Sequence, residues 1–206
     1  HTLTREGHHV LDLTASNPTV LDLPYPTDLL DALGTPRALR YAPAAVGLRT
    51  AREAVAADAA RRGATIDPDD LVLAASTSEA YSWLFKLLCD PGDAVLIPRP
   101  SYPLFEHLSR LEAVRTIDYG LEYHGRWEID WRAFEDAPAD TRAVVLVSPN
   151  NPTGSYISAR ERARLETLCR DRGWAIIADE VFAEYSLETS PPITDLAVRS
   201  EALCFS

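Results

Sequence analysis

The feature that most constrains the fold is a series of short, almost uninterrupted apolar runs that alternate with helix-like segments. Strands are expected at residues 71–74, 94–97, 114–119, 143–147, 175–178 and 202–205. Helices are expected at residues 50–62, 78–89, 102–111 and 158–172, the first and last of them followed by a glycine. Strands that are apolar throughout are buried on both faces, which is typical of a parallel sheet covered by helices. We therefore predict an α/β fold of three layers, with a mostly parallel sheet between two layers of helices.

The first 49 residues have a different pattern. Prolines recur there among turn-forming residues, at Asn17-Pro18, Pro24-Tyr25-Pro26 and Gly34-Thr35-Pro36. We expect residues 1–49 to form an irregular arm or small-lobe segment and residues 50–206 to form the large domain. The chain lacks methionine and stops directly after an apolar run, so the large domain is expected to be incomplete at its C-terminal end.

Composition excludes several classes of protein. Hydrophobic residues are 46% and charged residues 25% of the chain, which excludes an intrinsically disordered protein. No apolar run approaches the roughly 20 residues of a membrane-spanning helix, so no membrane partner is expected. The net charge of −11 argues against a nucleic-acid partner. The cysteines and histidines lack metal-site spacing, so no metal is expected, and the cysteines are interpreted as buried thiols of a cytoplasmic protein.

Ligands of open α/β sheets bind beyond the carboxyl ends of the strands, and polar residues of this chain gather there. Ser76, Thr77 and Ser78 lie between an expected strand and an expected helix. Backbone N–H groups and hydroxyls at a helix N-terminus bind anions, phosphate above all. The alternative is an ordinary helix N-cap formed by Ser76 or Ser78.

Two further strand ends carry polar groups. The segment from Ser148 to Gly154 follows a buried strand and holds two adjacent asparagines, Asn150 and Asn151, between prolines. A rigid loop of this kind offers fixed amide groups to a ligand, although asparagine and proline also form ordinary turns. Asp179 directly follows another buried strand. A carboxylate there needs a partner, either a cationic ligand atom or the backbone N–H groups that an N-cap satisfies.

In combination and in this order, these segments resemble the fold-type-I enzymes that depend on pyridoxal 5′-phosphate (PLP), specifically the class I and II aminotransferases. The residues that carry the resemblance are Asn17-Pro18-Thr19, Tyr41, Gly47, Ser76-Thr77-Ser78-Glu79-Ala80, Asp90-Pro91-Gly92-Asp93, Pro100-Ser101-Tyr102-Pro103, Ser148 to Gly154 and Ala178-Asp179-Glu180-Val181. The resemblance covers nearly the whole chain. It implies the large domain of a PLP-dependent transferase, and an enzyme that transfers an amino group from an amino acid to a 2-oxo acid.

The resemblance also implies roles for single residues toward PLP. Asp179 would hold the proton on the pyridine nitrogen, which keeps the ring an effective electron sink. Asn151 would bind the ring hydroxyl, and Tyr102 would stack on the pyridine ring. The segment 76–78 would bind the phosphate. The alternative for Tyr102 is a core aromatic on a helix.

The arm supplies the remaining candidates. Tyr41 resembles the tyrosine that reaches the phosphate of the neighbouring subunit's PLP, which implies a homodimer with shared active sites. The alternative for Tyr41 is a surface aromatic in a proline-rich arm. Asn17 and Thr19 resemble residues that line the substrate side.

The sequence departs from the family pattern in several places. Phe182 stands where the family usually has a tyrosine that donates to the ring hydroxyl, and the sequence leaves open whether Tyr185 replaces it. Ser76 stands where many relatives have glycine. The one lysine of the chain, Lys86, lies on the helix after the phosphate segment and is expected to face solvent. The Schiff-base lysine and the arginine for the substrate carboxylate are expected after Ser206, so no catalytic residue is assigned within this chain.

A fold does not determine a reaction, so other functions stay open. The same scaffold serves PLP-dependent lyases and decarboxylases. It also serves as a non-catalytic, aminotransferase-like sensor domain in transcription regulators. The sequence does not indicate which amino acid or 2-oxo acid is used.

Overall fold

The computed structural model describes residues 5–9, 17–185, 196–197 and 200–206 of the chain. The chain divides into two compact units, residues 1–43 and 44–206. The larger unit contains the sheet and every candidate residue from Ser76 to Asp179.

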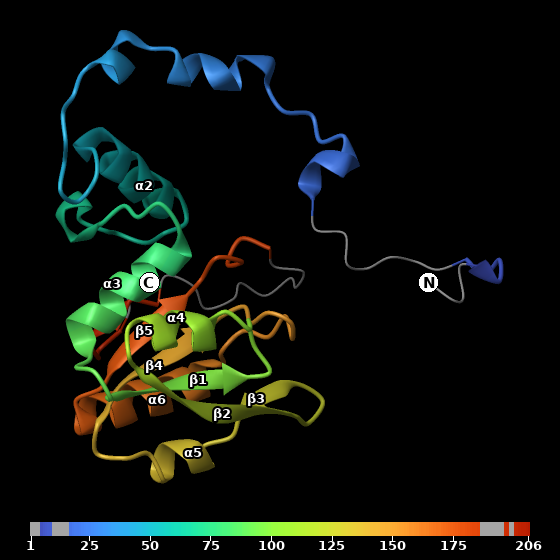
Figure 1. Cartoon of the computed structure of the whole chain (residues 1–206), viewed down its shortest axis with the longest axis vertical. Helices are drawn as coiled ribbons and strands as arrows, with labels where there is room; N and C mark the ends of the chain where they lie inside the picture. Colours follow the sequence, from blue (N-terminus) through green and yellow to red (C-terminus); the bar gives the residue numbers. More distant parts are fainter. Residues whose placement is uncertain (1–4, 10–16, 186–195, 198–199) are drawn as a thin grey trace. The chain divides into compact units, whose positions relative to one another are not determined.

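The smaller unit is built from short 3-10 helices. These are η1 (Pro18–Leu21), η2 (Thr27–Leu33) and η3 (Pro36–Leu39), drawn in blue in Figure 1. A proline opens η1 and η3, because its ring presets the helical φ and lacks the N–H that a first turn leaves unpaired. Its apolar side chains are widely exposed, Leu30 by 70% and Leu39 by 89%. The unit therefore leaves much of its own apolar surface uncovered.

A six-stranded sheet organises the larger unit. Its strands are β1 (Ala94–Arg99), β2 (Arg115–Tyr123), β3 (Trp127–Ile129), β4 (Thr141–Val147), β5 (Ala175–Asp179) and β6 (Cys204–Phe205). They lie in the order β3-β2-β1-β4-β5-β6, of which Figure 1 labels β1 to β5, and all neighbours are parallel except β2 and β3. The expected, mostly parallel sheet is confirmed. The chain adds β2 on one side of β1 and β4 on the other, so the topological switch point lies between β1 and β4.

The first helices of the larger unit precede β1, and the later ones connect strands. They are α2 (Arg49–Arg61), α3 (Thr77–Leu88), α4 (Phe105–Leu111), α5 (Arg132–Glu135) and α6 (Ala159–Arg172), with a 3-10 turn η4 (Pro68–Asp70). The start of α6 is a capping box, in which the side chains of Ser158 and Glu161 each accept from the other residue's backbone N–H. The helix ends at Gly173, whose φ of +68° suits a residue without a Cβ. Among the described residues, no helix combines the length and apolar character that spanning a membrane would take.

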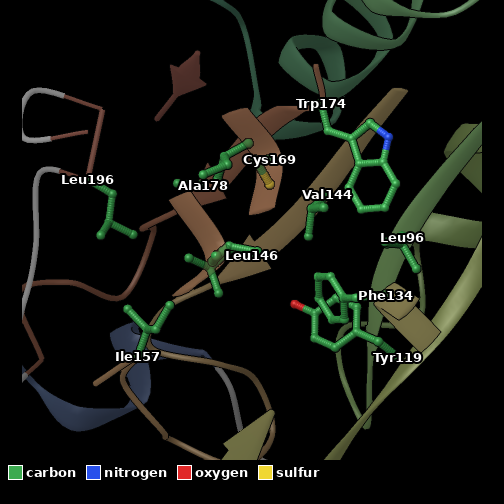
Figure 2. Packing of buried hydrophobic residues seen from close by; sticks show 12 residues of the cluster. Leu96, Tyr119, Phe134, Val144, Leu146, Ile157, Cys169, Trp174, Ala178 and Leu196 are labelled. Carbon is green, nitrogen blue, oxygen red and sulfur yellow. The ribbon is translucent and has the colours of Figure 1, made fainter. Parts of the chain in front are cut away.

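The hydrophobic core has two halves, one on each face of the sheet, because successive strand residues point to opposite faces. One half joins alternate strand residues to side chains of α5 and α6, among them Leu96, Phe134 and Cys169 (Figure 2). The other half joins the intervening strand residues to side chains of α3 and α4, among them Val95, Phe85 and Phe105. The expected three layers are therefore confirmed.

The cysteines behave as small apolar side chains. Cys169 is buried, Cys89 and Cys204 are half-buried, and all three are free thiols. Burial raises the pKa of Cys89 to about 11 and that of Cys169 to about 12, so both thiols stay protonated at physiological pH.

Some elements differ from those expected. Residues 71–74 form no strand, and the Leu73 N–H donates instead to the Val46 carbonyl oxygen at 3.1 Å. A short apolar run becomes a strand only when a neighbouring strand pairs with it, and none of the described strands does. The helix expected around α4 starts late, at Phe105: Pro103 disfavours a helical conformation at Tyr102, and residues 103–104 form a turn. Sequence periodicity missed β3 and α5 because both are very short.

Candidate functional site

Two loops meet at the switch point between β1 and β4. The first follows β1 and carries Pro100, Ser101 and Tyr102, and the second covers residues 148–154. Asn150, which is 3% exposed, joins them. Its Oδ1 accepts from Ser101 Oγ at 2.8 Å, and its Nδ2 donates to the Pro100 carbonyl oxygen at 3.0 Å. The two loops are therefore held as one surface at the carboxyl ends of the strands.

The two adjacent asparagines of the second loop have different environments. Asn150 also donates to Thr153 Oγ1 at 2.9 Å, so its amide group is engaged within the protein and acts as a clamp between the loops. Asn151 is exposed, and its amide group is available to a ligand. The resemblance named Asn151 as the ligand residue, but sequence reasoning missed the clamp that Asn150 forms, because this role depends on contacts with the other loop.

Asp179 ends β5 beside the second loop. The Ser148 N–H donates to the Asp179 carbonyl oxygen at 2.9 Å, which extends the pairing of β4 and β5 to this edge. The side chain is half-buried, and both carboxylate oxygens accept hydrogen bonds, Oδ1 from Val181 N at 3.1 Å and Oδ2 from Tyr81 Oη at 2.9 Å. The segment after Asp179 is a turn and not a helix, although Oδ1 accepts from a following backbone N–H as an N-cap would. A carboxylate oxygen accepts more than one hydrogen bond, so Asp179 retains capacity for a ligand donor.

Sequence reasoning missed Tyr81, which lies on α3. The side chain is 6% exposed and packs edge-on against Phe105, with ring centroids 5.1 Å apart. Burial and the adjacent Asp179 carboxylate hold the pKa of the Tyr81 phenol well above its ordinary value. The hydroxyl therefore stays protonated at physiological pH and donates a hydrogen bond. Positions 81, 84, 85 and 88 form the core-facing stripe of the helix, which hides this tyrosine among core residues. The available signal was Asp179 itself, since a half-buried carboxylate needs a donor.

The N-terminus of α3 combines a cap with an open first turn. Ser76 Oγ accepts from Glu79 N at 3.2 Å, and Glu79 Oε2 accepts from Ala75 N at 2.6 Å. The alternative of an ordinary N-cap is therefore confirmed for Ser76. Thr77 and Ser78 begin the helix, where N–H groups lack partners inside the helix and attract anions. The Ser76 cap uses the Glu79 N–H, so the N–H groups of Thr77 and Ser78 remain available to an anion such as phosphate.

Tyr102 lies in the first loop, before the start of α4. The side chain is 46% exposed, and its ring meets Phe105 edge-on with centroids 6.2 Å apart. The alternative of a core aromatic on a helix is therefore wrong for this residue. An exposed aromatic ring at the strand ends is available to stack on a planar ligand.

A continuous series of contacts joins these residues. Phe105 packs edge-on against both Tyr102 and Tyr81. Tyr81 in turn donates to Asp179 and belongs to the helix that Ser76 caps. The structure therefore brings the candidates of α3 and of the three strand-end loops to one edge of the sheet.

The candidates of the arm belong to the smaller unit and are described by themselves. Asn17 caps η1, and its Oδ1 accepts from Thr19 N at 3.0 Å and from Thr19 Oγ1 at 2.7 Å. Tyr41 is 95% exposed. Their roles toward a ligand stay predictions.

Phe182 and Tyr185 follow Asp179 in the turn after β5. Their rings lie edge-on with centroids 6.1 Å apart, and both side chains are exposed. Phe182 has no hydroxyl, so of this pair only Tyr185 can donate a hydrogen bond from its side chain.

Lys86 lies near the C-terminal end of α3. Its Nζ donates to Ser82 Oγ at 2.7 Å and forms an ion pair with Glu112. This pairing lowers the pKa of the Glu112 carboxyl group. The side chain is 60% exposed, as expected for a solvent-facing lysine, and its amine serves an ion pair on the helix surface.

Comparison with known proteins identifies the family. Residues 8–205 match the family described as aminotransferase class I and II, so the chain belongs to that family. The resemblance that the sequence motifs indicated is confirmed, and so is the fold class.

The relatives carry several aminotransferase names. The chain is 32% identical over 151 residues to nicotianamine aminotransferase 1 of Oryza sativa subsp. japonica. This alignment covers 72% of the chain and 31% of the relative. It is 29% identical over 211 residues to alanine aminotransferase of Mycobacterium tuberculosis. This alignment covers 99% of the chain and 48% of the relative. An aspartate aminotransferase structure from Thermotoga maritima aligns with a TM-score of 0.77 and 26% identity, covering 97% and 53%. The chain thus spans about half the length of these relatives or less.

Proposed function

We propose that residues 44–206 bind PLP at the carboxyl ends of the strands, and that the protein is an aminotransferase acting on an amino acid and a 2-oxo acid. The observation that carries the proposal is the environment of Asp179. Its carboxylate ends a buried strand next to the switch point, and its two donors, Tyr81 and Val181, are both neutral. A negative charge in such a place suits a cationic ligand atom. Membership of the aminotransferase family supports this reading.

The chemistry of the available groups fits PLP. The ligand presents a pyridine nitrogen, a ring hydroxyl, a planar ring and a phosphate. Asp179, Asn151 and Tyr102 offer a carboxylate, an amide and an aromatic face for the first three. Thr77 and Ser78 offer first-turn N–H groups and hydroxyls for the phosphate. When bound, PLP supplies an electron sink for charge that develops on the substrate.

Each of these residues has a separate task in the proposed site. Asp179 holds the proton on the pyridine nitrogen, because a neighbouring carboxylate favours the protonated form. Asn151 donates its amide N–H to the ring hydroxyl oxygen, and Tyr102 fixes the plane of the ring. Thr77 and Ser78 hold the phosphate, while Ser76 keeps the end of α3 in a helical conformation.

We propose that Lys86 does not bind PLP covalently. It lies eight positions beyond Ser78, roughly 12 Å along the helix at ~1.5 Å per residue. Its amine is engaged by Glu112 and Ser82. Borohydride reduction of the full-length protein with PLP, followed by peptide mass mapping, should give no pyridoxyl adduct on Lys86. An adduct on this residue would contradict the proposed site.

We further propose a cytoplasmic homodimer with shared active sites, in which Asn17 and Thr19 line the substrate side. The support is the exposure of Tyr41 and of the apolar side chains in the arm, which a second copy would cover. Sedimentation should show a dimer, and Tyr41→Phe should weaken PLP binding without changing the sedimentation coefficient. A monomer that binds PLP as tightly as related dimers would contradict this proposal.

Transamination by the full-length protein tests the proposed function. Glutamate and a new 2-oxo acid should form from an amino acid and 2-oxoglutarate in the presence of PLP. Asp179→Ala should lower the rate by ~100-fold or more, because the developing charge loses its partner. The matched control is Asp140→Ala, since Asp140 pairs with Arg115 at 2.7 Å at the opposite edge of the sheet. Near wild-type turnover by Asp179→Ala, or a lyase or decarboxylase product, would contradict the proposal.

A further inference from the structure

Two buried tyrosines on opposite faces of the sheet use their hydroxyls differently. Tyr119, on β2, is 1% exposed and donates to the Val145 carbonyl oxygen at 2.8 Å. Tyr81, on α3, donates to Asp179 Oδ2 at 2.9 Å. The first hydroxyl satisfies a backbone group inside the core. The second reaches the carboxylate at the edge of the sheet where ligands bind.

The contact with Tyr81 fixes the rotation of the Asp179 carboxylate. Val181 N holds Oδ1, and the Tyr81 hydroxyl holds Oδ2. With Val181 N alone, the carboxylate would be held at one oxygen and could turn about its bond to the rest of the side chain. Both donors are neutral, so they orient the carboxylate and leave its negative charge for a ligand.

Tyr81 is itself rigidly held. Phe85 and Phe105 flank its ring with centroid distances of 5.9 Å and 5.1 Å. The helix that carries it begins at the Ser76 cap, and the first turn of that helix is the proposed phosphate site. One helix thus offers donors to the phosphate at its N-terminus and, about one turn later, a donor to the carboxylate of Asp179.

We propose that Tyr81 is a positioning residue, which orients the Asp179 carboxylate toward the pyridine nitrogen of bound PLP. The inference rests on the proposed function and gives α3 a second task besides binding the phosphate. Tyr81 acts through Asp179 and not by touching PLP. Its contribution should therefore exist only for a ligand that carries the ring nitrogen.

Two ligands separate this role from a general effect on packing. One is PLP, and the other is its 1-deaza analogue, in which carbon replaces the pyridine nitrogen. Dissociation constants are measured by absorbance titration of the ligand-free full-length protein for the wild type, Tyr81→Phe and Tyr119→Phe. Tyr119→Phe is the matched control, since it removes a buried hydroxyl from the opposite face of the same sheet. Tyr81→Leu is measured beside them as a second variant that lacks the hydroxyl and keeps an apolar side chain.

Tyr81→Phe and Tyr81→Leu should weaken PLP binding about tenfold, as the loss of an orienting hydrogen bond to a charged group does. Both should bind the deaza analogue as the wild type does, and Tyr119→Phe should leave both constants unchanged. An equal loss for the two ligands, or no loss for either, would overturn the inference. A wild type that binds neither ligand would instead overturn the proposed function, an outcome that does not depend on Tyr81.

Discussion

Each edge of the sheet has an aspartate at or next to the end of a strand, and the two aspartates have different hydrogen-bond donors. At the amino edge, Asp93 precedes β1 and accepts from Arg142 Nε at 2.8 Å and from Asp90 N at 2.9 Å. The Arg142 guanidinium and the Asp90 N–H hold the pKa of the Asp93 carboxyl group below its ordinary value. At the carboxyl edge, Asp179 accepts from two neutral groups instead.

This difference separates charges that pair with one another within the fold from a carboxylate that is available to a ligand. Charges at the amino edge neutralise one another, as Arg115 and Asp140 also do, and such pairs contribute to folding. The donors to Asp179 are neutral and do not compensate its carboxylate, and Tyr102 and Asn151, in strand-end loops at the same edge, are exposed. Open α/β proteins bind their ligands at the carboxyl edge, which is where this chain keeps an aspartate with spare capacity.

Exchanging each aspartate for asparagine tests the comparison most severely. Asp179→Asn should weaken PLP binding to the full-length protein by ~100-fold, because the pyridinium loses its charged partner. Its melting temperature should stay near that of the wild type. Asp93→Asn should lower the melting temperature and leave the PLP affinity unchanged, since Arg142 loses its partner. Ligand titrations and thermal melts measure both properties, and the comparison fails if both variants lose the same one.

Tyr102 offers a second test of the carboxyl edge. Tyr102→Ala should weaken PLP binding by up to about tenfold, the value of one aromatic stacking contact, while Tyr102→Phe should bind like the wild type. Tyr123→Ala is the matched control, because Tyr123 is also exposed but lies on β2 against Trp127. Loss of affinity in Tyr102→Phe equal to that in Tyr102→Ala would show that the ring face is not what binds.

Ser76 caps the helix whose first turn is the proposed phosphate site, and two variants separate its effect on stability from its effect on PLP binding. Ser76→Ala should lower the free energy of unfolding by ~1 kcal/mol, because α3 loses its N-cap. Ser76→Asp keeps a good N-cap and should preserve stability, but its charge should repel the phosphate and weaken PLP binding several-fold. Pyridoxal, which lacks the phosphate, should bind Ser76→Asp like the wild type. Equal effects of Ser76→Asp on both ligands would contradict the phosphate site.

Acid unfolding tests the ion pair of Asp93 and Arg142 at the amino edge, with a smaller expected effect. The pKa of Asp93 is lower in the folded protein than its ordinary value, so its stabilisation is fully present above about pH 5. It is lost as the pH falls through the lower, folded value. The stability difference between wild type and Asp93→Asn, measured by denaturant titration, should therefore shrink between about pH 5 and pH 2. A difference that stays constant over this range would contradict the role of the Asp93–Arg142 pair.

The sheet could be predicted because its central strands are apolar throughout. The place of Asn151 and Asp179 at strand ends followed from the same runs. The run at residues 71–74 looked similar and forms no strand, since pairing depends on a neighbour and not on the run itself. The roles of Asn151 and Asp179 toward PLP come from the resemblance and stay predictions.

Tyr81 and Asn150 could not be predicted from the sequence. A tyrosine in an apolar helical stripe looks like a core residue, and an asparagine between prolines looks like a turn residue. What distinguishes them is a contact across the fold, from Tyr81 to Asp179 and from Asn150 to Ser101. Ser76 shows the opposite case, because its cap is local and the sequence pattern contains it.

In the proposed site, the Asp179 carboxylate meets the pyridine nitrogen of PLP at the carboxyl edge of the sheet. Nitrogen-15 NMR of PLP labelled at that nitrogen and bound to the full-length protein reports directly whether the nitrogen carries a proton. We expect a protonated nitrogen at neutral pH in the wild type and in Asp140→Ala, and an unprotonated nitrogen in Asp179→Asn. The same protonation state in the wild type and in Asp179→Asn would contradict the account.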